Sequence, residues 1–160
     1  MTITLRLIEA RDNAPLAALI RAALTEFGAD RPGFAWQDPE LSNLSEAYAR
    51  PGLNYWVVML GSVLVGGCGI APLRPWVAET CELQKMYLCP SARGQGVGTL
   101  LIETALAFAG LQYHWCYLES LTTMTGAASF YRKAGFIALP QPLVITQHGA
   151  CDSWYLKALE

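Results

Sequence analysis

The stretch that decides the fold is Glu82-Leu-Gln-Lys-Met-Tyr-Leu-Cys-Pro-Ser-Ala-Arg-Gly-Gln-Gly-Val-Gly-Thr99. Residues 82–88 have the composition of a β-strand, and apolar residues with helical spacing follow over 98–109. Between them, three glycines in five residues leave the backbone N–H groups free of side-chain obstruction. Arg93 adds a positive charge, and the helix N-terminus adds unpaired donors. The stretch therefore predicts a strand, an anion-binding turn suited to a pyrophosphate, and a helix.

The spacing of the glycines distinguishes this turn from two common nucleotide-binding turns. A P-loop needs a lysine directly after its last glycine, and none follows here. A dinucleotide fingerprint needs a third glycine at the position that Thr99 occupies. The spacing present is Arg93-x-x-Gly96-x-Gly98. Taken alone, this spacing favours the simpler interpretation, a tight turn that only connects a strand to a helix.

Strand and helix patterns alternate along the rest of the chain. The predicted strands are 3–8, a hairpin over 54–71, 82–88, 114–119, 136–139, 143–147 and 154–158. The predicted helices are 14–27 with Asp12 as its N-cap, a second helix from Asp38 that stops before Pro51, 98–109 and 125–134. This order predicts a mixed sheet with helices on its faces.

One segment has the length of a membrane span, because no charged residue lies between Arg50 and Arg74. Its several glycines would destabilise a helix, and Gly61-Ser62 separates two runs of β-forming residues. We therefore expect two buried strands and no contact with a membrane. The cluster of glycines over 66–69 indicates a bulge or a close approach of backbone or ligand.

Composition and charge exclude further classes of protein. The chain has 160 residues, 53% of them apolar and 15% charged, with a formal net charge of −2. This composition argues against disorder, and the length suits a single domain, 1–160. Nucleic acid is not an expected partner, since proteins that bind nucleic acid carry a basic face. The N-terminal residues lack the long apolar core of a signal peptide.

The cysteines are odd in number and none has a CxxC spacing: Cys68, Cys81, Cys89, Cys116 and Cys151. Reduced thiols in a cytoplasmic protein are the direct interpretation. Only Cys151 and His148 lie close enough in sequence to share a metal ion, and two ligands do not make a zinc site. We therefore expect no metal.

A second motif follows the glycine-rich turn, the run Ala-Ser-Phe-Tyr-Arg-Lys-Ala-Gly-Phe at 128–136. In this combination and element order, the chain resembles the GCN5-related N-acetyltransferase (GNAT) superfamily over nearly its whole length. The resemblance implies an α/β (α+β) fold with a mixed, mostly antiparallel six- to seven-stranded sheet flanked by about four helices. It also implies direct transfer of the acetyl group of acetyl-CoA to an amine of a small molecule or peptide in a ternary complex. A homodimer is expected by analogy alone.

The resemblance also assigns the residues that would bind acetyl-CoA. The strand before the turn would lend backbone groups to the pantetheine arm, at Met86, Tyr87 and Leu88. The turn would hold the pyrophosphate, at Arg93, Gly94, Gln95, Gly96, Val97, Gly98 and Thr99. Many family members place an asparagine that contacts the cofactor seven residues before the motif tyrosine, and here that position is Met124.

Three residues are implied in catalysis by the same resemblance. Tyr131 would protonate the departing thiolate, and Glu82 would serve as general base, directly or through water. Some members use a carboxylate one strand later, where this chain has Glu119. The plainer interpretations stay open: Tyr131 as a core aromatic between two phenylalanines, and both glutamates as structural residues.

Other residues have less specific interpretations. On a regular strand, Glu82, Gln84, Met86 and Leu88 would share one face, and we expect Lys85 to be an exposed charge. His148 and Cys151 lie in a predicted turn, where a histidine is usually solvated but could contact the acceptor. The loop over 26–36 mixes carboxylates and aromatics, which suits either recognition of a cationic amine or a lid packed on the core.

Two other functions remain compatible with the sequence. The first is a module of the same fold that binds an acyl-CoA without acetylating anything, which the replacement of the asparagine by Met124 keeps open. The second is an unrelated α/β nucleotide-binding protein. The lack of an adjacent lysine and of a metal-binding carboxylate pair argues against the second.

Overall fold

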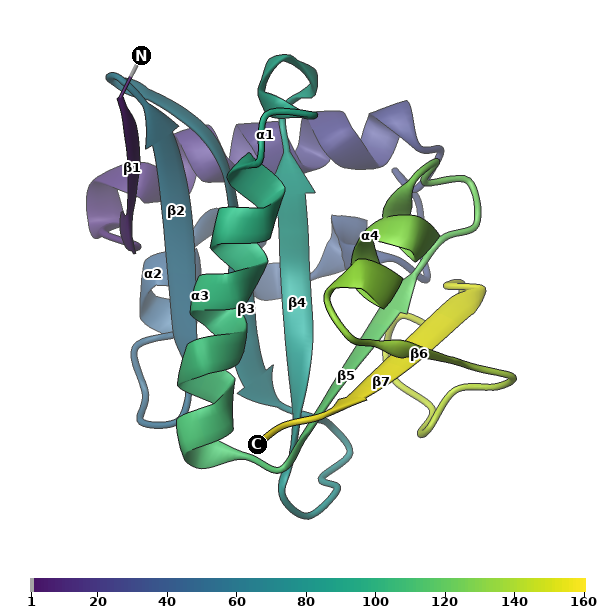
Figure 1. The fold of residues 1–160 in the computed structure, drawn as a ribbon. Helices are drawn as coiled ribbons and strands as arrows, with labels where there is room; N and C mark the ends of the chain where they lie inside the picture. Colours follow the sequence, from purple (N-terminus) through teal and green to yellow (C-terminus); the bar gives the residue numbers. More distant parts are fainter. Residues whose placement is uncertain (1) are drawn as a thin grey trace.

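The computed structural model describes residues 2–160 and is built on one seven-stranded sheet (Figure 1). The strands are β1 (Ile3–Leu7), β2 (Asn54–Leu60), β3 (Val63–Pro72), β4 (Thr80–Leu88), β5 (Trp115–Ser120), β6 (Ile137–Leu139) and β7 (Ser153–Ala158). Their spatial order is β1-β2-β3-β4-β5-β7-β6, and every neighbouring pair is antiparallel except β4 and β5. The predicted mixed, mostly antiparallel sheet is confirmed.

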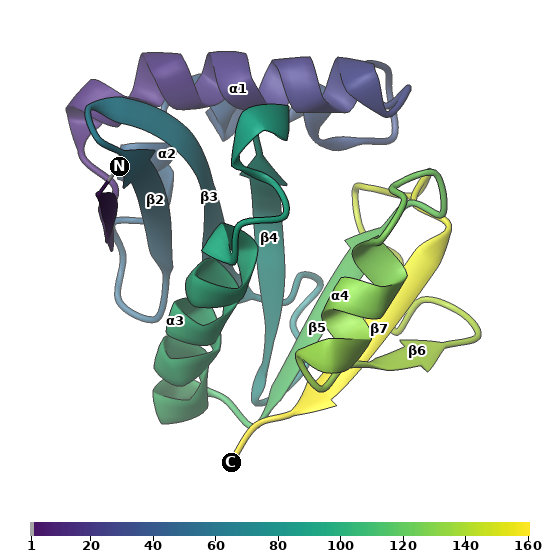
Figure 2. The ribbon, with the colours of Figure 1, turned by 45° about the horizontal axis from the view of Figure 1, so that its top comes forward.

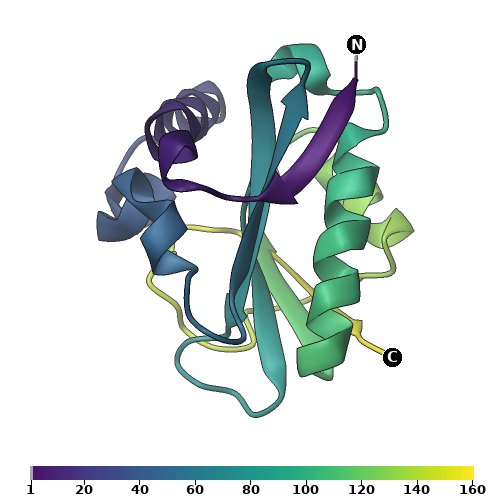
Figure 3. The same cartoon turned by 90° about the vertical axis from the view of Figure 1, so that its left-hand side faces the viewer.

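The helices cover both faces of the sheet (Figure 3). One face carries α1 (Asn13–Glu26) and α2 (Leu44–Ala47), and the other carries α3 (Val97–Gln112) and α4 (Ala127–Lys133). Short 3-10 turns at Ala10–Asp12, Ala35–Gln37, Pro39–Ser42 and Pro90–Ala92 connect these elements. The second predicted helix is shorter than expected, because the non-helical backbone at Asn43 divides it into a 3-10 turn and one α-helical turn.

Helix α1 shows how the apolar pattern produces the core on its face of the sheet. Leu16, Ile20 and Leu24 recur every fourth residue, are fully buried, and share a cluster with Tyr55 of β2. Asp12 precedes the helix as predicted, but its carboxylate accepts hydrogen bonds from Arg6 and from the Glu9 amide and does not cap α1. The corresponding cluster under α3 contains Leu101, Ile102, Ala105 and Ala109.

The uncharged segment forms the hairpin of β2 and β3, at the centre of one half of the sheet. Its glycines allow close packing: a Cβ on Gly66 would lie 2.5 Å from the Tyr87 carbonyl oxygen, and one on Gly69 would lie 2.7 Å from the Tyr48 ring. The register of β3 is irregular against both neighbours in this region, as the glycines predicted. Within the described part of the chain, no helix is long and apolar enough to cross a membrane.

A bulge in β4 overturns the predicted strand faces. Gly67 of β3 pairs with Tyr87 and Gly69 pairs with Gln84, so Lys85 and Met86 together oppose a single residue of β3. Lys85 adopts a positive φ of 49° there. Met86 consequently packs with the α3 cluster, whereas Gln84 lies on the opposite face. The expectation that Glu82, Gln84, Met86 and Leu88 share one face was wrong.

The predicted strand at 143–147 was also wrong. These residues belong to an irregular connection between β6 and β7, because β7 pairs directly with β5 and β6 and leaves no strand position for them. The segment is instead anchored by side-chain hydrogen bonds, from Thr146 to Glu119 and between His148 and Asp38.

Candidate active site

The site forms where β4 and β5 part. The two strands pair only over Thr80–Glu82 and Trp115–Tyr117, and then diverge (Figure 2). From that point to Leu88, the edge of β4 that faces β5 has no strand partner among residues 2–160. The Lys85 and Leu88 carbonyl oxygens accept hydrogen bonds from the side chains of Tyr55 and Arg93. The other backbone groups of this edge have no strand partner and can bind a ligand, and cavities open on both faces of the sheet beside it.

The first cavity, of about 660 Å³, lies between the end of β4, the glycine-rich turn and α4. Its lining includes most of the residues that the sequence predicted for cofactor binding, together with Tyr131: Met86, Tyr87, Leu88, Arg93, Gly94, Gly96, Gly98 and Thr99. Gly94 and Gly96 have φ of 74° and 79°, which non-glycine residues rarely adopt. Gly96 is the N-cap of α3, so the free amides of the helix face this cavity.

Two residues of the turn do not contribute side chains to the lining. Val97 is fully buried in a core cluster with Val58 and Val65, and it anchors the first turn of α3. The Gln95 side chain donates a hydrogen bond to the Ser91 carbonyl (2.6 Å) and holds the turn closed. Both residues therefore hold the conformation of the turn, and their side chains do not line the cavity.

Arg93 is held at the rim of the first cavity by contacts that the sequence did not reveal. Its guanidinium donates to both carboxylate oxygens of Glu26 (2.7 and 2.8 Å) and to the Leu88 carbonyl oxygen. The guanidinium also lies 5.3 Å from the centre of the Phe27 ring. An anion at this turn would meet a preformed arginine, with the Glu26 carboxylate as its competitor.

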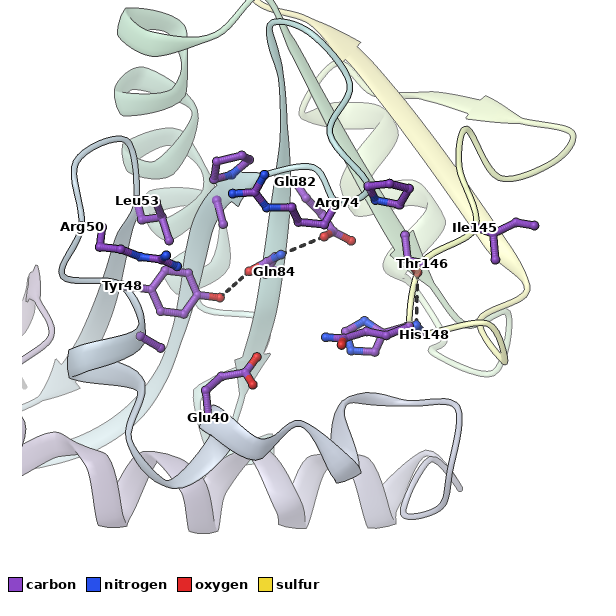
Figure 4. Close-up of a pocket in the computed structure, with 15 residues that line it drawn as sticks. Glu40, Tyr48, Arg50, Leu53, Arg74, Glu82, Gln84, Ile145, Thr146 and His148 are labelled. Atoms are coloured by element: carbon purple, nitrogen blue, oxygen red, sulfur yellow. Dashed lines mark hydrogen bonds between the residues drawn. The ribbon is translucent and has the colours of Figure 1, made fainter.

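The second cavity, of about 490 Å³, lies on the opposite face of the sheet, between α2, β4 and the connection to β7 (Figure 4). Glu82 is at its floor and is 7% exposed. Its Oε1 accepts a hydrogen bond from the Gln84 side chain (2.8 Å), and Gln84 in turn accepts one from the Tyr48 hydroxyl (2.6 Å). Burial raises the pKa of Glu82 to about 7, and the nearby Glu119 carboxylate contributes to the increase.

A buried ion cluster lies beside the second cavity and contributes Glu40 and His148 to its lining. Lys85 is 8% exposed, and its Nζ lies 2.6 Å from Asp38 and 3.4 Å from Glu40. The prediction that Lys85 is exposed was therefore wrong, because the bulge turns this side chain toward Asp38. The His148 Nε2 lies 3.0 Å from the same Asp38 carboxylate. Burial opposes its charged form, but the hydrogen bond to Asp38 prevails and raises the pKa of His148.

A small cavity of about 60 Å³ lies between the two larger ones and shares lining residues with each. It shares Glu82 and Gln84 with the second cavity, and Tyr87 and Met124 with the first. Glu119 of β5 also lines it, and its carboxylate accepts hydrogen bonds from the hydroxyls of Tyr117 and Thr146. The two larger cavities therefore both adjoin this small cavity at the opening between β4 and β5.

Tyr131 belongs both to the core and to the first cavity. Its ring packs against Phe130, Phe136 and Tyr155 with centroid distances of 5.4, 5.9 and 5.6 Å. Burial raises the pKa of its phenol, which stays protonated at neutral pH. Met124 lines the same cavity and accepts a hydrogen bond from the Ser120 hydroxyl at its sulfur.

Sequence reasoning missed the polar residues that the fold brings to the second cavity from distant segments. Tyr48, Arg50 and Arg74 line it, and none belongs to a motif. The sequence offered one signal for the two arginines: they are the charged residues on either side of the uncharged hairpin. Within residues 2–160, no group of three or more His, Cys, Asp or Glu residues is arranged to hold a metal ion.

An open mixed sheet, a parallel pair of strands that part, and a glycine-rich turn capping a helix define the acyl-CoA N-acyltransferase fold. Residues 51–138 match the family model described as an acetyltransferase (GNAT) domain. The chain belongs to the GNAT family.

Individual relatives agree with this assignment. The chain is 37% identical over 158 residues to the uncharacterized N-acetyltransferase YjgM of Escherichia coli K12, covering 97% of this chain and 94% of that protein. A GNAT-family acetyltransferase of Staphylococcus aureus Mu50 superposes with a TM-score of 0.85 at 20% identity, covering 99% and 100% of the two chains. YncA of Salmonella typhimurium, solved with acetyl-CoA, gives a TM-score of 0.80 at 19% identity, covering 100% and 95%.

Proposed function

We propose that this protein is an N-acetyltransferase that moves the acetyl group of acetyl-CoA directly to an amine, within a ternary complex. The observation that carries the proposal is that two cavities approach each other from opposite faces of the sheet and both adjoin a small cavity at the opening between β4 and β5. One has an anion-binding turn and a protonated phenol, and the other has a buried carboxylate. Two substrates approaching from opposite faces would place their reacting atoms at this junction.

Acetyl-CoA would occupy the first cavity. The free amides of the turn and Arg93 suit the pyrophosphate, and the unpaired edge of β4 over Met86–Leu88 suits the amide groups of the pantetheine arm. Acetyl-CoA in the YncA structure supports this choice of co-substrate. Met124 lies beside the same cavity but lacks the amide group of the family's asparagine.

The chemistry requires the amine nitrogen to lose two protons and the departing thiolate to gain one. An amine with a pKa of about 10.4 is mostly protonated at neutral pH, so Glu82 accepts the ammonium proton before attack on the thioester carbonyl and later releases it to solvent. As the neutral amine forms the C–N bond, a strand N–H near Leu88 stabilises the oxyanion. As the C–S bond breaks, Tyr131 gives its proton to the departing thiolate, and the second proton that the nitrogen loses restores the phenol. We favour Glu82 over Glu119, because two hydroxyls already donate to Glu119.

Acetyl-CoA should raise the melting temperature of the protein, because a ligand that binds only the folded state stabilises it. At one hundred times its Kd, the stabilisation is about 2.7 kcal/mol, or about 5 °C or more for a chain of this size. Differential scanning fluorimetry with millimolar acetyl-CoA measures the shift. Arg93→Glu should reduce it, whereas Arg132→Glu, at an exposed position of α4, should leave it intact. An unchanged melting temperature would contradict both an enzyme and an acyl-CoA-binding module.

The rate of acetylation should fall as the pH drops through about 7, the pKa of Glu82. Below that pH the carboxyl is protonated and cannot accept the amine proton, and above it the base form dominates. Initial rates at saturating acetyl-CoA from pH 5.5 to 8.5 measure this limb, and the amine's own ionisation gives a separate limb at higher pH. Glu82→Gln should remove the lower limb together with most of the rate. An unchanged limb in that variant would exclude Glu82 as the base.

The proposal also includes the expected domain organisation, location and oligomeric state of the protein. Residues 1–160 would act as one domain, because both cavities open onto a single sheet. The five free cysteines are compatible with reduced thiols in the cytoplasm. A homodimer rests only on analogy with the family.

A further inference from the structure

Negatively and positively charged side chains lie in different parts of the second cavity. Glu82 lies buried at the floor, and its carboxylate is contacted by the neutral amide of Gln84. Arg50 and Arg74 lie at the rim, on the connections that lead into β2 and β4, and both side chains are exposed. In Figure 4 the Arg50 guanidinium lies beside Tyr48, and the Arg74 side chain extends toward the same side of the cavity. The cavity is thus anionic at its floor and cationic at one part of its rim.

The other charged groups around this cavity are already neutralised by one another. Lys85 pairs with Asp38 at 2.6 Å and with Glu40 at 3.4 Å, and His148 contacts Asp38 at 3.0 Å. The two rim arginines differ, because no carboxylate of residues 2–160 lies within ion-pair distance of either guanidinium. Their positive charges face the cavity with no ionic partner among the described residues.

Given the proposed acetyltransferase activity, on which this inference rests, we propose that the acceptor is a zwitterion, an amine that carries its own carboxylate, as in a free α-amino acid. The amine would lie at Glu82, and the carboxylate would bind between Arg50 and Arg74. A guanidinium matches a carboxylate with two parallel hydrogen bonds, which fixes orientation as well as affinity. The cavity of about 490 Å³ is of a size that suits a small molecule.

Other amines fit this arrangement poorly. A polyamine would place its second ammonium group against the rim arginines, which like charges oppose. The N-terminal amine of a long peptide has no carboxylate close to it, so the arginines would stay unpaired. The chain of hydrogen bonds from the Tyr48 hydroxyl through Gln84 to Glu82 lines the wall between the two ends and holds the base in place. Each end of a zwitterion therefore meets a group of opposite charge.

The test uses the twenty standard L-amino acids, their C-terminal amides and spermidine as probes, with thiol release from acetyl-CoA as the readout. We expect at least one amino acid to be acetylated with a kcat/KM at least about tenfold above that of its own amide. Arg50→Gln and Arg74→Gln should each raise the KM for that amino acid by about tenfold and leave the amide unaffected. Arg21→Gln, on the exposed surface of α1, is the matched control and should change neither.

Each contrary result has a distinct meaning. Preference for amides or for spermidine would overturn the zwitterion and leave the acetyltransferase standing, as would arginine variants with unaltered KM. A protein whose melting temperature rises with acetyl-CoA but which acetylates no amino acid also overturns it. Failure to bind acetyl-CoA at all would instead remove the proposed function on which the inference rests.

Discussion

Replacing Tyr131 with Phe should lower kcat by about 10²- to 10³-fold, in the range that general acid catalysis contributes. The substitution removes only the hydroxyl group, so the aromatic packing against Phe130, Phe136 and Tyr155 is kept. Burial raises the pKa of this phenol, which makes it a proton donor at neutral pH. The Kd for acetyl-CoA should stay within about twofold, because the hydroxyl acts on the departing thiolate and adds little to ground-state binding.

The matched control is Tyr155→Phe, since Tyr155 contacts the Tyr131 ring but does not line the first cavity. It should leave kcat nearly unchanged. Steady-state rates and isothermal titration with acetyl-CoA on both variants separate turnover from binding. Equal turnover in Tyr131→Phe and the unaltered protein would show that Tyr131 is only a core aromatic, the plainer interpretation of its sequence context.

Lys85→Met should reduce the free energy of unfolding by about 3–5 kcal/mol, the usual effect of removing one partner from a buried ion pair. Asp38 would remain buried at 4% side-chain exposure with only His148 to compensate its charge. Urea unfolding followed by circular dichroism measures the loss. Lys133→Met, at an exposed position of α4, should change stability by less than about 0.5 kcal/mol.

A double variant tests whether the loss comes from the uncompensated charge. Lys85→Met combined with Asp38→Leu removes both partners, and it should recover part of the stability that the single variant loses. If Lys85→Met alone unfolds with the same urea midpoint as the unaltered protein, the cluster contributes no stability. The cluster would then serve only to position His148 on the cavity wall.

The parts of the fold that local sequence determines were predictable. The turn and α3 depend on glycines and apolar spacing within a few residues of one another, and the structure places Gly94 and Gly96 in the positive-φ region they imply. The hairpin over β2 and β3 was equally clear, because Gly61-Ser62 interrupts two β-forming runs. In both cases the deciding interactions lie close together in the sequence.

The failures that affect the site involve partners far away in the sequence. Lys85 is buried because a register shift against β3 turns it toward Asp38, 47 residues earlier. His148 is fixed by the same Asp38 across 110 residues. No periodicity within β4 or the last connection encodes such contacts, so the lysine was expected in solvent and 143–147 was expected as a strand. The acceptor side of the site is built mainly from such long-range contacts and was therefore the least predictable part.

The glycines of β3 also limit how the range of acceptors of this protein can be redesigned. Tyr48 at the cavity wall packs directly on Gly69, where even a methyl group would lie 2.7 Å from the ring. The Tyr48 ring also packs on the buried Tyr55 ring, with 5.2 Å between the ring centroids, so trimming either ring would leave a cavity in the core. Room for a bulkier acceptor is more easily gained at the rim, at residues such as Ile145, which is 87% exposed. Directed evolution toward larger amines should therefore accumulate its changes in the last connection and leave the sheet untouched.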